Sequence, residues 1–320
     1  MSYLINSFRF PNQGTFLSIS RTGTNRLMKS DDGITWTSVS TGDNTGDYRG
    51  MVWAKDKNII VAVGAGSGQS SYDGVNWSAN TINTLSTDFQ GIAYSQQLSK
   101  FITLSTSHTH RVYHSNDGIT FTSGTISSRT WVNAIWADTF GMFIAAGRTA
   151  GNPSPTVVAS SSDGEVFTER YISSTNDNTP GIGYAPGLGV NGRAVILPRG
   201  ANSGRYSDNG TDWSNSVTHP IGVWNSIAWS PKLEMFVAVS SGVNFVASST
   251  DGISWTTRTA AENIGWLSVT WSDYLEKFVA VSVTGTNRVM YSTNGTSWTS
   301  ASAAQVNEWR VVIYTDGFIF

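Results

Sequence analysis

The sequence predicts an all-β protein, a seven-bladed β-propeller, because one short motif recurs seven times along its 320 residues. In each copy a serine stands two residues before an Asp or Asn, which is followed by Gly and then, three residues after the glycine, by Trp or Phe. The motif glycines lie 41 to 46 residues apart, so a unit of about 44 residues repeats. Each unit carries four short segments of strand character, and radial repetition of four-stranded sheets makes a propeller. The Asx residues are Asp32, Asp73, Asp117, Asp163, Asn209, Asp251 and Asn294.

The first segment of each unit is clearest at residues 266–271, Trp-Leu-Ser-Val-Thr-Trp. Every copy ends on a large aromatic residue, has an apolar residue two positions earlier on the same face, and carries mostly small residues between. The bulky side of one sheet can therefore pack against the thin side of its neighbour. The apolar residues are Met51, Ile92, Ala134, Ile182, Ile227, Val269 and Val312, and the aromatics are Trp53, Tyr94, Trp136, Tyr184, Trp229, Trp271 and Tyr314.

Three further segments complete the four antiparallel strands of a blade. The second is an apolar run such as 236–239 or 278–281, which is typical of a strand buried on both faces. The third, such as 288–291, follows a variable loop, and the fourth, such as 35–38, follows the Asx-Gly pair. An Asx-Gly pair between strands predicts a tight turn, since Gly adopts positive φ and Asx bonds the local backbone. We interpret the seven Asx side chains as structural.

The two ends of the chain predict how the ring closes. The last first-strand segment, 309–314, has no motif after it, whereas residues 14–38 supply three strands without a first one. Residues 22–26 also repeat 284–288 identically. We therefore expect N- and C-terminal strands to share one blade and residues 1–320 to form a single domain. Ile5–Phe10 and Phe318–Phe320 have no assigned place in this scheme.

Composition excludes several classes of site. The chain has no cysteine, which rules out disulfides, zinc-thiolate sites and thiol nucleophiles. Its net charge of -2 and scattered arginines do not suit a nucleic-acid partner. Neither a signal peptide nor a membrane-inserted segment is expected, because no basic and then apolar leader and no apolar run near 18 residues is present. No cofactor is expected, because no phosphate loop or Ser-His-Asp spacing is recognisable.

An arginine opens the third strand in four units, and these four residues are candidate carbohydrate-binding residues. A guanidinium beside aromatic rings can hold sugar hydroxyls or a carboxylate. The alternative is that each guanidinium bonds backbone carbonyls as a structural fixture. The four are Arg26, Arg111, Arg205 and Arg288.

His108 and His110 are candidate metal ligands, because alternation places both on one side of an extended segment. The alternative is an exposed polar hairpin, since no acidic or cysteine partner is close in sequence. Binding specificity is expected in the loops that depart most from the repeat. These are residues 64–69, 147–155 and 198–204.

The recurring motif resembles the Asp-box, or BNR, repeat of sialidase-like propellers, with one residue fewer between Asp and Gly. Together with first strands such as 224–229, it resembles the propeller repeats of bacteriophage and large-virus proteins, including tail and fibre components. The resemblance implies that the Asx side chains lie at the periphery. Sialidase activity does not carry over: Arg49 and Arg310 belong to no recognisable arginine triad, and seven blades differ from the six of sialidases.

These observations lead us to expect a non-enzymatic binding module that recognises a cell-surface glycan or another virion protein. The expected location is the virion or the extracellular space, after synthesis in the cytoplasm. The alternative is a purely structural particle protein that acts as a protein–protein scaffold. A glycan-cleaving, sialidase-like enzyme is a third possibility that rests on fold analogy. Composition and motifs leave the oligomeric state open.

Overall fold

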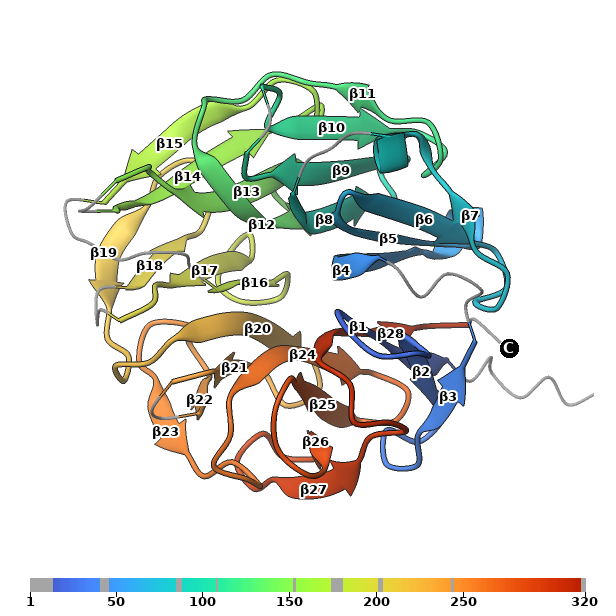
Figure 1. Ribbon diagram of the computed structural model, residues 1–320. Coiled ribbons are helices and arrows are strands. Elements are labelled where there is room, and N and C mark those ends of the chain that lie inside the picture. Colours follow the sequence, from blue (N-terminus) through green and yellow to red (C-terminus); the bar gives the residue numbers. More distant parts are fainter. Residues whose placement is uncertain are drawn as a thin grey trace, which may run out of the picture.

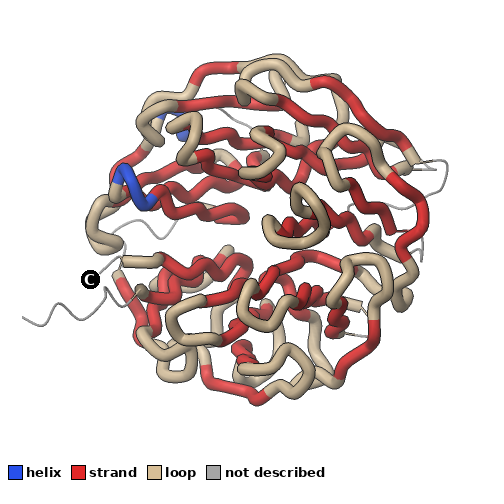
Figure 2. Tube along the Cα trace, turned by 180° about the vertical axis from the view of Figure 1, so that it is seen from behind, coloured by secondary structure: helices blue, strands red, loops and turns tan. Residues whose placement is uncertain are grey.

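The computed structural model describes residues 14–40, 46–84, 88–107, 109–151, 154–173, 181–200, 204–242 and 245–317. These residues form seven four-stranded antiparallel sheets arranged radially, as blades, about a central axis (Figure 1). The helical elements of the described residues are two short 3-10 turns, η1 (Lys55–Lys57) and η2 (Thr81–Thr84). Strands make up the ring when it is seen from behind as well (Figure 2). The predicted seven-bladed, all-β fold is confirmed.

Each blade runs from an inner strand beside the axis to an outer strand at the rim (Figure 1). Six blades are continuous in sequence: β4 (Asp47–Ala54), β5 (Ile59–Ala65), β6 (Ser67–Ser71), β7 (Ser78–Ala79); β8 (Phe89–Ser95), β9 (Lys100–Ser105), β10 (Val112–Ser115), β11 (Thr122–Ser123); β12 (Thr130–Ala137), β13 (Met142–Arg148), β14 (Thr156–Ser161), β15 (Thr168–Ile172); β16 (Gly181–Ala185), β17 (Arg193–Leu197), β18 (Gly204–Ser207), β19 (Ser214–Val217); β20 (Trp224–Ser230), β21 (Met235–Ser240), β22 (Val246–Ser249), β23 (Thr256–Arg258); and β24 (Trp266–Ser272), β25 (Lys277–Ser282), β26 (Arg288–Ser292), β27 (Thr299–Ser302).

The seventh blade joins the two ends of the chain, as predicted. Its inner strand β28 (Trp309–Thr315) pairs with β1 (Thr15–Ser20), which is followed by β2 (Leu27–Ser30) and β3 (Thr37–Val39). Phe16 lies opposite Tyr314 in this pairing. The fourth strand begins later than the predicted 35–38, because Thr35 still belongs to the preceding turn and donates its backbone N–H to Asp32 Oδ1. Ile5–Phe10 and Phe318–Phe320 lie outside the described residues.

The small residues of the inner strands allow neighbouring blades to approach one another. A Cβ added to Gly50 would stand 2.9 Å from the carbonyl oxygen of Gln90 in the next blade. Between β24 and β28, the backbone N–H of Val312 donates to Ser268 Oγ at 3.1 Å. The aromatic residue that ends an inner strand packs instead on the second strand of its own blade, as Trp229 does on Phe236 with ring centroids 4.7 Å apart. The thin faces thus set how tightly the ring closes.

All seven Asx-Gly motifs form the same turn between the third and fourth strands, and we call these the Asx-Gly turns. In each, the serine hydroxyl donates to the Asx Oδ1 at 2.8–3.2 Å and accepts the glycine N–H at 2.8–2.9 Å. The next two backbone N–H groups donate to the same Oδ1. The glycines have φ of 70–75°. The Asx oxygen is therefore engaged by its own turn.

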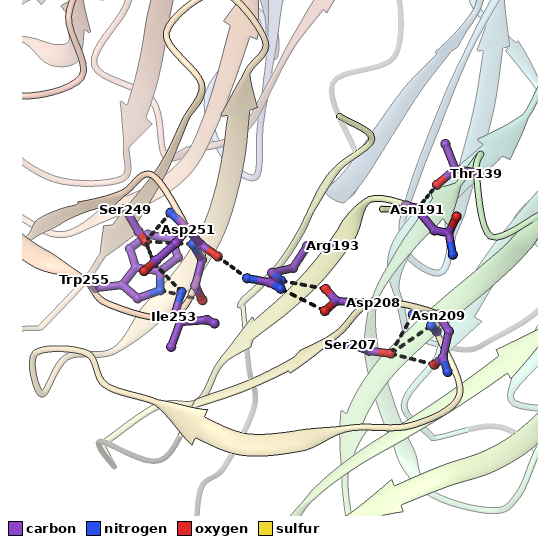
Figure 3. Close-up of polar contacts among 12 residues, drawn as sticks. Thr139, Asn191, Arg193, Ser207, Asp208, Asn209, Ser249, Asp251, Ile253 and Trp255 are labelled. Atoms are coloured by element: carbon purple, nitrogen blue, oxygen red, sulfur yellow. Dashed lines mark hydrogen bonds and ion pairs between the residues drawn. The ribbon is translucent and has the colours of Figure 1, made fainter. Parts of the chain in front are cut away.

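In six of the Asx-Gly turns the glycine also lies against the preceding blade. A Cβ on Gly252 would stand 2.7 Å from Val195 Cγ2 of the blade before it. Arg193 forms a two-pronged ion pair with Asp208 and donates to the carbonyl oxygen of Asp251 in the next turn (Figure 3). In addition, the backbone N–H of Trp255 donates to the carbonyl oxygen of Thr218, which follows the last strand of the preceding blade, at 3.0 Å. The turns thus link blade to blade around the rim.

Candidate binding site at the mouth of the central channel

Six inner strands carry a β-bulge directly after their first aromatic residue. In β4, for example, pairing with β5 shifts between Tyr48 and Gly50 and leaves Arg49 without a partner in the ladder. Bulges turn a side chain out of the regular alternation of a strand. The six bulged residues, which we call the bulge ring, are Arg49, Gln90, Val132, Asn225, Leu267 and Arg310.

A buried aromatic residue anchors each bulge. Trp224, Trp266 and Trp309 are fully buried at the start of their strands. Their indole N–H groups each donate to the carbonyl oxygen four residues earlier in the chain, at 3.0, 3.3 and 3.0 Å. An indole that is packed and hydrogen-bonded holds the backbone beside it in place. The bulge ring is therefore built on rigid positions.

The whole bulge ring lines one hollow of about 170 Å³ where the inner strands begin, which we call the channel mouth. Asn133, Arg199 and Trp224 complete its wall. A second hollow of about 310 Å³ continues along the inner strands and shares six lining residues with the first: Arg49, Gln90, Asn133, Asn225, Leu267 and Arg310. Its wall includes an aliphatic ring contributed by all seven blades. The aliphatic ring consists of Met51, Ile92, Ala134, Ile182, Ile227, Val269 and Val312.

Arg49 is the one arginine of the channel mouth that lies between two carboxylates. Its Nη2 lies 2.7 Å from Asp47 Oδ2 and its Nη1 lies 2.5 Å from Asp88 Oδ1. Burial acts to lower the pKa of Arg49, but the hydrogen bond to Asp47 and the charge of Asp88 outweigh it and raise that pKa above its usual value. Arg49 is thus electrically compensated within the protein.

Arg199 and Arg310 are not compensated in this way. Among the described residues, Arg310 forms no hydrogen bond or ion pair, and Arg199 has one hydrogen bond, from Nη2 to Asn225 Oδ1 at 3.0 Å. Burial lowers the pKa of both guanidinium groups. Nearby arginines lower both pKa values further, although the charges of Asp47 and Glu308 oppose this for Arg310. The channel mouth therefore holds two arginines that form no ion pair with the described residues.

The four arginines predicted from the repeat lie elsewhere, and none of them lines either hollow. Arg26 and Arg288 donate from Nε to the carbonyl oxygens of Gly23 and Gly285, at 3.2 and 3.0 Å. Arg205 is buried, with its Nε 2.6 Å from the hydroxyl of Tyr171. Arg111 has a buried Nε without a hydrogen-bond partner. Carbohydrate binding by this set stays a prediction.

Of the predicted metal ligands, His108 lies outside the described residues. His110 is exposed, with its ring edge-on to Tyr113 at a centroid distance of 6.3 Å. The described part of the chain contains no cluster of three His, Cys, Asp or Glu side chains suited to a metal. Its helical elements include none long and apolar enough to cross a membrane. Metal binding at the histidines stays a prediction.

Sequence reasoning missed the channel mouth, although the signal was present. The sequence places Arg49 and Arg310 in no recognisable motif and marks residues 198–204 only as a variable loop. The position directly after the first aromatic residue of an inner strand holds Arg, Gln, Val, Asn, Leu and Arg in the six bulged copies. When the side chain at one position differs among repeats that are otherwise alike, the fold does not require a particular residue at that position.

No known family model and no curated protein matches the sequence. Solved structures of similar shape include a functionally unknown protein from Desulfotomaculum acetoxidans DSM 771, with 9% identity over 95% of this chain and 99% of that one and a TM-score of 0.70. A streptogramin B lyase matches with 10% identity over 85% and 91% of the two chains and a TM-score of 0.66. YCF48 bound to D1 peptide matches with 11% identity over 90% and 84% and a TM-score of 0.56.

The prediction that this chain is not an enzyme is wrong, because its fold is also the fold of streptogramin B lyase, which is an enzyme by its name. That prediction rested on finding no catalytic spacing along the sequence. A ring brings residues of distant blades together, as it does for Arg199 and Arg310, so sequence spacing does not exclude chemistry at its centre. At these levels of identity, the comparisons show that the chain has the β-propeller fold.

Proposed function

We propose that this chain is a binding module that receives a protein partner across the face that carries the channel mouth. The observation that supports this function best is the bulge ring, where a repeated backbone presents varied side chains around a hollow with two uncompensated arginines. Rigid scaffolds with varied side chains at one place are suited to recognition. YCF48, a propeller of similar shape, is bound to a peptide in its solved structure.

An array of synthetic peptides tests the proposal. The native protein, the double variant Arg199→Gln/Arg310→Gln and a control variant, Arg258→Gln, would be applied in parallel. Arg258 lies on the outer strand β23 and lines neither hollow, so its replacement removes one positive charge away from the site. We expect a defined set of peptides to bind the native protein and the control but not the double variant. An array that stays blank, or binding that the double variant keeps, would overturn the proposal.

A second candidate is recognition of an acidic cell-surface glycan by a virion-associated protein. It is supported by the resemblance of the repeats to viral propellers and by the positive charge at the channel mouth. Binding of sialylated or uronic-acid glycans that depends on Arg199 and Arg310, on a glycan array that is run beside silent peptide arrays, would favour it. Stoichiometric incorporation into purified particles would test the location and the scaffold alternative.

A further inference from the structure

We propose that the channel mouth is a binding site for an aliphatic carboxylate, whose two oxygens are held between Arg199 and Arg310. This inference deepens the proposed function, because it names the chemical group that a partner places in the site. The two arginines come from blades that lie on opposite sides of the ring, β16–β19 and the closing blade, yet both line the same hollow of about 170 Å³ (Figure 1).

The charge balance of the channel mouth points to an anion. Three of the nine residues that line the smaller hollow are arginines, and none is Asp or Glu. Arg49 already has Asp47 and Asp88 beside it, whereas Arg199 and Arg310 have no carboxylate within ion-pair distance among the described residues. Like charges that are partly buried repel each other more strongly than in water. An anion between Arg199 and Arg310 would remove that repulsion.

Arg199 is held in position before any ligand arrives. Asn225 accepts from Arg199 Nη2 through Oδ1 at 3.0 Å and donates from Nδ2 to the carbonyl oxygen of Trp266 at 2.9 Å. The Asn225 side chain, itself held by the backbone at Trp266, thus orients the Arg199 guanidinium. The other N–H groups of Arg199 remain available for a ligand. A planar guanidinium that is oriented in this way suits a planar carboxylate. Asn225 is accordingly a positioning residue.

The adjoining hollow offers an aliphatic contact for the body of the ligand. Its volume is about 310 Å³, and its wall combines the aliphatic ring, with members such as Ile227 and Val269, with polar side chains such as Ser268. A ligand whose carboxylate lies between the arginines would extend its remaining atoms along this wall. The aliphatic side chains give an apolar group on the ligand a surface to contact, which an inorganic phosphate would not use. Two sources supply such a group: a free aliphatic carboxylic acid, or the C-terminal residue of a protein chain.

Titrations followed by NMR test the site with defined probes. N-acetyl-leucine is the probe, N-acetyl-leucine amide retains the apolar body without the carboxylate, and acetate retains the carboxylate without the body. The arginine Nε–H signals of the isotope-labelled protein report on the guanidinium groups directly. We expect N-acetyl-leucine to shift the signals of Arg199 and Arg310 saturably, and both control compounds to bind at least tenfold more weakly. No saturable shift with N-acetyl-leucine, or equal binding of its amide, would overturn the inference.

Variants separate this inference from the proposed function. Arg199→Gln and Arg310→Gln are each expected to weaken N-acetyl-leucine binding roughly ten- to a hundredfold, the effect of losing a charged hydrogen bond. Arg258→Gln should leave it unchanged, with thermal unfolding as the check that every variant is folded. Peptides with a free or an amidated C-terminal leucine distinguish the two sources. Peptide binding that depends on the arginines but is equal for free and amidated C-termini would overturn the inference and leave the proposed function standing. Binding of N-acetyl-leucine without binding of any peptide would overturn the proposed function and leave the inference standing.

Discussion

The Asx-Gly turns at the rim and the bulge ring at the channel mouth are both repeated backbone features, but they use their side chains differently. Every turn has the same serine, Asx and glycine, and each of these groups is engaged inside the turn, as the Ser249, Asp251 and Gly252 contacts show. The bulge ring repeats the backbone irregularity with arginine, amide and aliphatic side chains in turn. The side chains are the same in every repeat where they bond the backbone of the turn, and they vary where the backbone irregularity does not depend on them.

This difference separates the residues that stabilise the turns from those of the candidate site. The turn carboxylates form a regular acidic series in the sequence, yet backbone N–H groups already occupy them. The channel-mouth arginines show no regularity in the sequence, yet two of them have unused hydrogen-bonding capacity. Regular spacing therefore identifies scaffold in this protein, and departure from it identifies the candidate site.

The largest expected effect concerns the aromatic anchor of a bulge. Trp309 is fully buried and donates its indole N–H to the carbonyl oxygen of Gln305. Trp309→Ala should lower the free energy of unfolding by about 3–5 kcal/mol, because it leaves a large cavity and an unpaired carbonyl. The matched variant Leu267→Ala, at a half-buried member of the bulge ring, should cost less than about 1 kcal/mol. Urea unfolding midpoints measure both, and equal losses would contradict the distinction between anchor and ring.

The next effect concerns the glycine of a turn. Gly252 has φ of 70° and its added Cβ would meet Val195 at 2.7 Å, so Gly252→Ala combines backbone strain with a clash and should cost about 2–4 kcal/mol. Gly141 has φ of 63° with nothing within 4 Å of an added Cβ. Gly141→Ala should therefore show the strain alone, about 1–2 kcal/mol. If the two variants lose the same free energy of unfolding, the contact of Gly252 with the neighbouring blade does not contribute to stability.

A smaller contrast lies within the channel mouth. Arg49→Gln should lower stability by roughly 1–2 kcal/mol, because Asp47 and Asp88 lose their shared partner. Arg310→Gln should raise stability by less than about 1 kcal/mol, because it removes a partly buried charge whose pKa burial and the neighbouring arginines lower. Thermal unfolding at low salt measures both shifts. A loss of stability in Arg310→Gln would show that this arginine has a structural role.

The smallest effect separates aspartate turns from asparagine turns by pH. The hydrogen bond from the Asn76 side chain and the backbone N–H groups of the turn lower the pKa of Asp73 to about 2. An unfolded aspartate titrates near 3.9, so this turn contributes stability above about pH 4 and loses it as the pH falls toward about 2. Asp73→Asn should flatten the acid side of the stability profile by less than about 1 kcal/mol, since the site is solvent-screened. An unchanged profile between those pH values would contradict the role of the carboxylate charge.

The repeat made the fold predictable, because a unit that recurs seven times indicates the number of blades, the order of strands in a blade and the way the ring closes. The match between residues 22–26 and 284–288 indicated which strands share the closing blade, and β28 indeed pairs with β1. The fourth strand starts later than the predicted residues 35–38, because Thr35 and Trp36 favour strands but occupy turn positions, where Thr35 donates its N–H to Asp32. The channel mouth was not predictable in the same way, since Arg199 and Arg310 lie 111 residues apart in the chain.

The blade number and the turn chemistry follow from the amino-acid sequence, because both depend on local contacts that recur in every unit, and the order of the units at the two ends of the chain indicates the closing blade. Which charges meet depends on the tertiary structure. Among the described residues Arg49 forms ion pairs with two carboxylates while Arg199 and Arg310 form none, and that outcome depends on how seven inner strands converge on one axis. Local repeats can be recognised in the sequence, whereas side chains of distant blades meet at the axis only when the ring closes.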